Sequence, residues 1–99
     1  MPLPKYLQSA LWSYDLKKMD PQDKADKRII IEQILNYGTG KQLKWLYVTY
    51  SDKEVKEIVE KPSRGLWTKE SLNFWTKLYR VKLLPQIAQK AIMNINPTF

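Results

Sequence analysis

Two consecutive helix starts decide the fold, and both lie in residues 39–62, TGKQLKWLYVTYSDKEVKEIVEKP. In each, a Ser or Thr precedes a Gln or Glu by three positions, so that each side chain can cap a backbone N–H of the other. The two pairs are Thr39 with Gln42 and Ser51 with Glu54. Apolar residues with helical spacing follow each start, and Pro62 forbids continuation. The segment therefore predicts helices at 41–50 and 52–61.

Upstream, a third helix start lies at residues 20–23, DPQD. An aspartate, a proline at the first helical position and an early carboxylate are typical of a helix N-terminus. The apolar side chains that follow with helical spacing are Ile30, Ile34 and Tyr37. A helix over 21–37 that ends near Gly38 is the prediction. Before it, residues 7–14 are expected to form a short turn that lays Leu11, Trp12 and Tyr14 on the bundle.

Downstream, the chain predicts a basic loop and then more helix. Residues 61–65, KPSRG, contain proline and glycine and no apolar period, so they should form an exposed loop. The next helix is expected over 68–83, and Pro85 should kink or stop it. Its predicted buried stripe comprises Leu72, Trp75, Leu78 and Tyr79. A further helix is expected at 86–94, with residues 94–97 as its ending.

These patterns predict an all-α protein, a compact bundle of four to five short helices in a single domain over residues 1–99. The short junction at Ser51 also allows the helices at 41–50 and 52–61 to form a helix-turn-helix-like core. The second of them is disfavoured as a DNA-reading helix, because its carboxylates would meet phosphates. Those carboxylates are Asp52, Glu54, Glu57 and Glu60.

The residue types that are missing from the chain narrow its chemistry. It has no histidine and no cysteine. Ser-His-Asp and Cys-His nucleophiles, disulfides and the usual zinc ligands are therefore excluded. We expect a protein that is not an enzyme and that holds neither a metal nor a cofactor. Secretory and membrane-spanning patterns are also missing, which predicts a cytoplasmic protein that does not associate with membranes.

Charge is divided unevenly along the chain. Residues 1–60 have a net charge of +1, whereas residues 61–99 have a net charge of +6. Cations close to aromatic side chains suit the phosphates and bases of nucleic acid. Our first functional hypothesis is a small regulator that binds double-stranded DNA through a flexible basic loop and the helix after it. The predicted contact residues are Lys61, Arg64, Lys69, Lys77 and Arg80.

The tryptophans support a second hypothesis from another class. Trp45 lies beside an apolar stripe and Trp67 follows a glycine-containing loop, so both are candidate exposed anchors. The chain would then be a protein interaction module that binds an acidic partner. Burial of both tryptophans would count against this hypothesis. A homodimer is a further expectation, because small helical domains with spare aromatic side chains associate readily.

Four blocks of sequence carry a family resemblance, namely LWSYD at 11–15, IIIEQILNYG at 29–38, LKWL at 43–46 and LNFW at 72–75. In this order they resemble a family of small uncharacterised prokaryotic proteins that are often encoded beside an abortive-infection type nucleotidyltransferase toxin. The resemblance implies an all-helical domain that acts as the antitoxin-like or regulatory member of a two-gene pair. The acidic partner would then be such a toxin. Gly40 and the tail from Lys82 depart from the family pattern, and the family has no established catalytic residues to carry over.

Overall fold

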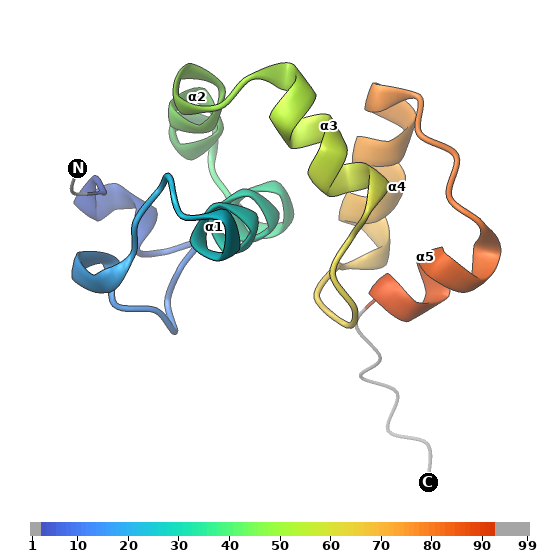
Figure 1. The fold of residues 1–99 in the computed structure, drawn as a ribbon, viewed down its shortest axis with the longest axis horizontal. Helices are drawn as coiled ribbons and strands as arrows, with labels where there is room; N and C mark the ends of the chain where they lie inside the picture. The colour runs from blue at the N-terminus through green and yellow to red at the C-terminus, as the bar shows by residue number, and fades with distance from the viewer. Residues whose placement is uncertain (1–2, 93–99) are drawn as a thin grey trace, which may run out of the picture.

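The computed structural model of the chain describes residues 3–92, which form an all-α fold (Figure 1). Two 3-10 helices precede five α-helices in this part of the chain. They are η1 (Lys5–Leu7), η2 (Leu16–Lys18), α1 (Lys24–Tyr37), α2 (Gly40–Thr49), α3 (Asp52–Glu60), α4 (Lys69–Tyr79) and α5 (Pro85–Ala91). None of these helices has the length and apolar composition needed to cross a membrane. The predicted all-α bundle is confirmed. Helix α5 ends at Ala91, three residues before the predicted end, because Ile92 is extended, and the ending predicted at 94–97 lies outside the described residues.

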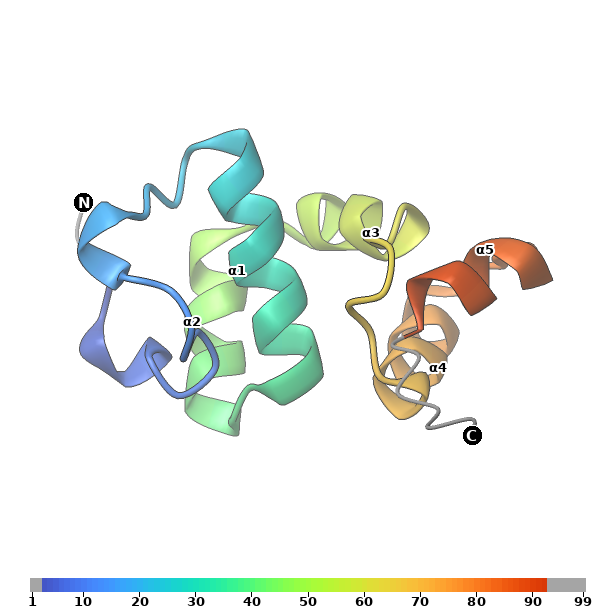
Figure 2. The same cartoon turned by 90° about the horizontal axis from the view of Figure 1, so that it is seen from below.

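Helix α1 is the centre of the bundle. It packs against α2, α3 and α4, and α3 also packs against α4. Figure 2 shows α1 beside α2 at one end of the molecule and α4 beside α5 at the other, with α3 between them. The closely packed pairs do not include α2 with α3. The two helices joined at Ser51 are thus each held by α1 rather than chiefly by one another.

Side-chain caps set the starts of α2 and α3. Thr39 Oγ1 accepts a hydrogen bond from the Gln42 N–H at 3.3 Å, and Gln42 Oε1 accepts one from the Thr39 N–H at 2.8 Å. This confirms the first predicted capping box. Ser51 Oγ accepts from the Glu54 N–H at 3.1 Å, but the Glu54 carboxylate pairs with Lys27 Nζ at 3.5 Å. The second predicted box is therefore only half formed.

Helix α1 begins three residues later than predicted, because Asp23 rather than Asp20 is its cap. The Asp23 carboxylate accepts hydrogen bonds from the backbone N–H groups of Ala25 and Asp26. The Asp20 carboxylate instead accepts from the N–H of Gln22, which is a local turn before the helix. Both aspartates are suitable caps, and the one that caps α1 is Asp23, which lies nearer to the apolar residues of the helix.

Helix α4 ends at Tyr79, four residues before the predicted end, because Arg80 adopts a left-handed conformation with φ of 55°. The Arg80 N–H donates to the Lys77 carbonyl at 3.2 Å, and the Val81 N–H donates to the Thr76 carbonyl at 2.8 Å. These two bonds define a Schellman ending, in which glycine is the usual residue. Pro85 neither kinks nor stops α4, since it is the first residue of α5.

The core lies where α1 meets its neighbours. Its largest fully buried apolar side chains are Leu7, Leu11, Ile30, Ile31, Ile34, Leu46, Val55, Val59, Trp67 and Leu72. Two side chains predicted to pack inside are exposed, Leu78 at 57% and Trp12 at 58%. Trp12 makes an edge-on contact with Tyr37, their ring centroids 5.0 Å apart, but most of its surface stays in solvent. Leu78 lies on the flank of α4 beside its buried stripe, so its inclusion in the predicted stripe was wrong.

Buried amides hold the irregular N-terminal segment to the bundle. Gln33 Nε2 donates to the Ala10 carbonyl at 3.0 Å. Gln42 Nε2 donates to Ser9 Oγ at 2.7 Å and also to the Tyr6 carbonyl. Both glutamine side chains are buried, so their amides require partners inside the protein. These bonds explain how a segment with only two short 3-10 turns is fixed against α1 and α2.

Tyr50 should make the protein sensitive to alkali. Its ring is 3% exposed, and its hydroxyl donates to the Pro21 carbonyl at 2.9 Å. Burial, followed by the nearby Glu54 carboxylate, raises the pKa of Tyr50 to about 12. The unfolded chain releases this proton near pH ~10, where the folded chain still holds it. Titration of Tyr50 therefore leaves the free energy of unfolding unchanged below pH ~10 and lowers it as the pH rises from there towards about 12.

Tyr50→Phe is expected to make this fall shallower by about 1–2 kcal/mol, because phenylalanine has no proton to release. Urea denaturation of both proteins at pH ~9 and pH ~12 measures the difference. Equal falls in the two proteins would mean that the alkaline sensitivity comes from other groups.

Candidate functional site

The loop between α3 and α4 is tied to α1. Arg28 Nη1 donates to the Lys61 carbonyl at 2.7 Å, and Glu32 Oε2 accepts from the Ser63 N–H at 2.7 Å. The same Glu32 oxygen accepts from the indole Nε1–H of Trp67 at 2.8 Å. Glu32 is 1% exposed, and Arg28 Nη1 lies 3.7 Å from its Oε2. The buried Glu32 carboxylate, which also forms an ion pair with Arg28, thus anchors the loop to α1.

The C-terminal segment ties the same loop from the other side. The Gly65 N–H donates to the Lys90 carbonyl at 2.8 Å, and the Trp67 N–H donates to the Ala91 carbonyl at 2.9 Å. Arg64 lies between these anchors and those on α1, and its side chain is exposed. It therefore projects from a backbone that is hydrogen-bonded to other elements on both sides.

The five cations predicted to contact DNA are all exposed. They are Lys61 and Arg64 in the loop, Lys69 at the start of α4, and Lys77 and Arg80 at its end. By helical spacing, Lys69 and Lys77 lie roughly 80° apart around α4 and about 12 Å apart along its axis. Arg80 lies just past the end of the helix in a left-handed conformation. The two side-chain ion pairs within residues 3–92 involve other cations. None of the five is therefore neutralised by a salt bridge in the described part of the chain.

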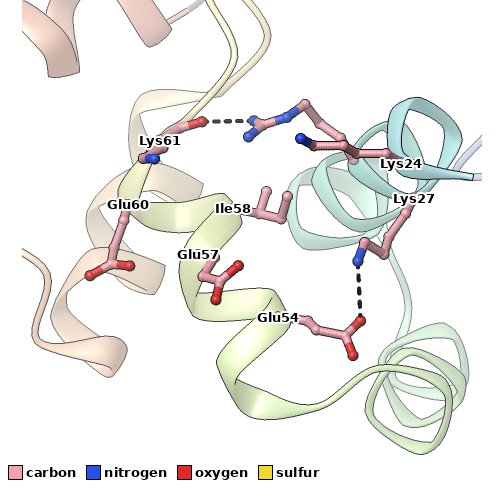
Figure 3. A pocket seen from close by; sticks show the side chains of 8 residues that line it. Lys24, Lys27, Glu54, Glu57, Ile58, Glu60 and Lys61 are labelled. Atoms are coloured by element: carbon pink, nitrogen blue, oxygen red, sulfur yellow. Dashed lines mark hydrogen bonds and ion pairs between the residues drawn. The ribbon is translucent and has the colours of Figure 1, made fainter.

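A cleft of about 610 Å³ lies between α1 and α3 (Figure 3). It is lined by Lys24, Lys27, Arg28, Glu54, Glu57, Ile58, Glu60 and Lys61. The cations come from α1 and from Lys61, and the carboxylates come from α3, so the cleft carries both signs of charge. Lys61 shares this cleft with Glu57 and Glu60, whose charges offset its own. Of the five predicted cations, Lys61 is thus the least suited to a phosphate.

The two tryptophans chosen as partner-binding anchors are not exposed anchors. Trp67 is 0% exposed, because its indole N–H is bound to Glu32 inside the core, and its assignment to a partner surface is wrong. Trp45 is half-buried against the core, with its ring edge-on to Tyr50 and their centroids 6.0 Å apart. An apolar surface does exist, but it lies on other residues.

That surface is a groove of about 650 Å³ between α2 and α4, called here the apolar groove. Its lining residues are Leu43 and Tyr47 of α2, Asp52 and Lys56 of α3, and Phe74, Trp75, Leu78, Tyr79 and Arg80 of α4 and its end. Phe74 and Leu78 are each 57% exposed, whereas Trp75 is buried at the floor. The sequence signal for this groove is the Phe74 and Leu78 pair, which is four residues apart and lies off the buried stripe of α4.

A tyrosine pair connects the two sides of the apolar groove. The hydroxyl of Tyr47 on α2 is hydrogen-bonded to the hydroxyl of Tyr79 on α4. Burial raises the pKa of both phenols, so this bond joins two neutral groups at physiological pH. The pair fixes the spacing of α2 and α4 at this point without placing a charge in the groove.

The chemistry that these features offer is binding. Among residues 3–92, no group of three or more acidic side chains is arranged to hold a metal ion. The described part of the surface presents a set of cations that form no salt bridge there, a cleft of mixed charge and an apolar groove. All three suit the recognition of another molecule through charge or apolar contact.

Comparison with known proteins gives one match. A family model described as a family of unknown function (DUF6922) matches residues 6–59. The matched part runs from η1 almost to the end of α3 and includes Arg28 and Glu32. The exposed cations of the loop and α4, and the α4 side of the apolar groove, lie beyond it. No curated protein and no solved structure matches the chain.

Proposed function

The chain belongs to DUF6922, a family of unknown function, and we propose that it is a non-enzymatic cytoplasmic regulator that binds double-stranded DNA through the loop after α3 and through α4. The observation that carries this proposal is the set of exposed cations on these two elements, which form no salt bridge within residues 3–92. They are Arg64, Lys69, Lys77 and Arg80. Glu70 is the only acidic residue of the sequence after residue 60, and Asp52 of α3 lies in the groove beside Arg80.

The hydrogen bonds that hold the backbone beneath these cations support the same proposal. Arg64 stands on a loop held from both sides, and the other three stand on α4 and its Schellman ending. Cations at fixed spacing lose less side-chain and backbone freedom when they meet phosphates than cations on a loose tail would. The carboxylates of α3 would repel phosphates, so we propose that the duplex approaches from the α4 side. The sequence resemblance adds an antitoxin-like role in a prokaryotic two-gene pair to this proposal.

Removing two of these cations tests the proposal without weakening the fold. In the variant Arg64→Glu with Arg80→Gly, glycine relieves the left-handed strain at position 80, which offsets any stability lost at position 64. We expect affinity for a labelled mixed-sequence duplex to fall by about tenfold or more, because two phosphate contacts and their counterion release are lost. The slope of log affinity against log salt concentration should fall by about 2. Fluorescence anisotropy at several salt concentrations measures both quantities.

A matched control is Lys18→Glu with Lys53→Ala, which changes the net charge equally at exposed positions on η2 and α3. Its effect on duplex affinity should be small. Equal losses in the two double variants would show a general effect of net charge and would contradict a binding surface on α4. Duplex affinity that neither variant changes would contradict it as well.

A second candidate function is a protein interaction module for an acidic partner, such as the toxin that the sequence resemblance suggests. The observation that favours it is the apolar groove, in which large side chains are exposed beside Lys56 and Arg80. Exposed apolar surface rimmed by polar groups is typical of protein interaction sites.

A further inference from the structure

We infer that the apolar groove binds an amphipathic helix of a partner protein whose apolar stripe is flanked by acidic residues. This inference rests on the second candidate function and names the ligand of its site. It differs from the sequence-based hypothesis, because the contact residues are Tyr47, Phe74 and Leu78 in place of Trp45 and Trp67.

The fold of this chain leaves much of the apolar surface of the groove in solvent. Leu72 and Trp75 already bury the inner face of α4, while Phe74 and Leu78 remain 57% exposed on its outer flank. Across the groove, Tyr47 is 38% exposed on α2. Solvating these large apolar surfaces side by side is unfavourable, and an apolar ligand would remove them from water.

The shape of the groove suits a helix. Leu43 and Tyr47 on α2, and Phe74 and Leu78 on α4, are pairs four residues apart, so each side presents a ridge with the spacing of one helical turn. A third helix packs between such ridges with its own side chains at three- and four-residue spacing. An extended peptide would need a free strand edge, but the backbone on both sides is helical and already hydrogen-bonded.

The charge at the rim of the groove favours an acidic ligand. Lys56 and Arg80 line the rim against the single carboxylate of Asp52. The whole chain carries a net charge of +7, which would steer an acidic partner towards it and repel a basic one. The other lining residues are neutral, so Lys56, Arg80 and Asp52 must recognise charge on the flanks of the ligand, while the apolar side chains meet its apolar stripe.

Two designed helical peptides test the inference. They share one leucine stripe and carry no tryptophan, and they differ only in their flanking residues, which are glutamates in one and lysines in the other. Isothermal titration calorimetry with the full chain should give a micromolar Kd for the glutamate peptide and an affinity about tenfold or more lower for the lysine peptide.

Leu78→Ser should weaken binding of the glutamate peptide by about tenfold, because it removes an apolar contact from the groove. Val48→Ser is the matched control, since Val48 is 81% exposed on α2 but does not line the groove, and it should change the Kd less than about twofold.

The outcomes separate the inference from the function on which it rests. If both peptides bind equally through Leu78, the groove is a protein-docking site without preference for acid, and the inference fails while the function stands. If neither peptide binds, or Leu78→Ser and Val48→Ser act alike, both fail. Sedimentation of the free protein tests whether a second copy of the chain occupies the groove. A dimer that dissociates in Leu78→Ser would show this and would overturn the inference. Loss of duplex affinity in Leu78→Ser would assign the groove to nucleic acid and overturn it too.

Discussion

Replacing Trp67 by alanine is expected to lower the free energy of unfolding by about 3–5 kcal/mol, which is a large part of the stability of a domain of this size. Three losses contribute to this cost. The ring is fully buried, so its removal leaves a cavity, and the indole hydrogen bond to Glu32 is lost. The anchored loop also loses the side chain that joins it to α1. Urea denaturation followed by far-ultraviolet circular dichroism measures the change.

Trp12→Ala is the matched control for this prediction. Trp12 is 58% exposed and contacts Tyr37 only by its edge, so we expect a loss below about 1 kcal/mol. Similar losses in the two variants would be inconsistent with a central role for Trp67 in the core.

Glu32→Ala is expected to cost about 2–5 kcal/mol, because it leaves two buried donors without an acceptor. These donors are the indole N–H of Trp67 and the backbone N–H of Ser63. Glu32→Gln should cost less, since the amide oxygen can still accept from both donors. Its cost comes from the lost ion pair with Arg28 and from an amide NH2 at the buried position of Oε1, which has no hydrogen-bond partner among the described residues. The same denaturation experiment compares both variants with Glu57→Ala, which removes an exposed carboxylate of α3 and should be nearly neutral.

Removing Glu32 and Trp67 together should cost less than the sum of the two single losses, because the two side chains share a hydrogen bond. Additive losses would mean that the two residues stabilise the protein independently. The proposed DNA surface provides a second readout. Glu32→Ala releases the loop that carries Arg64, so its duplex affinity should fall even at temperatures where the protein stays folded.

The starts of α2, α3 and α4 were predictable from sequence to within one residue, because a cap depends on residues within one turn of each other. Thr39 and Gln42 form their predicted box for this reason. The end of α4 was not predictable in the same way, since Arg80 occupies a left-handed position that statistics assign to glycine. Its conformation follows from the path of the chain towards α5, which no local pattern encodes.

Burial of individual aromatic side chains was predicted less well, because it depends on contacts between distant parts of the sequence. Trp67 follows a glycine-containing loop, so the sequence suggested that it is exposed. Its indole N–H instead donates to Glu32, 35 residues away in the sequence, and the ring is buried. Leu78 fits a helical stripe and looked buried, yet the neighbouring flank of α4 has no helix packed on it. The cations of α4 were identified correctly as exposed, since charged side chains rarely lose their water.

The bond between Glu32 and the loop has a consequence for modularity. The family match ends at residue 59, but the carboxylate of Glu32 lies inside the matched part and takes its donors from Ser63 and Trp67 beyond it. A fragment cut at the end of the match would lose both of these donors together with the buried Trp67 ring beside Glu32. The matched part therefore shares part of its buried hydrogen-bond network with the segment that follows it, and we expect it to be less stable alone than within the whole chain.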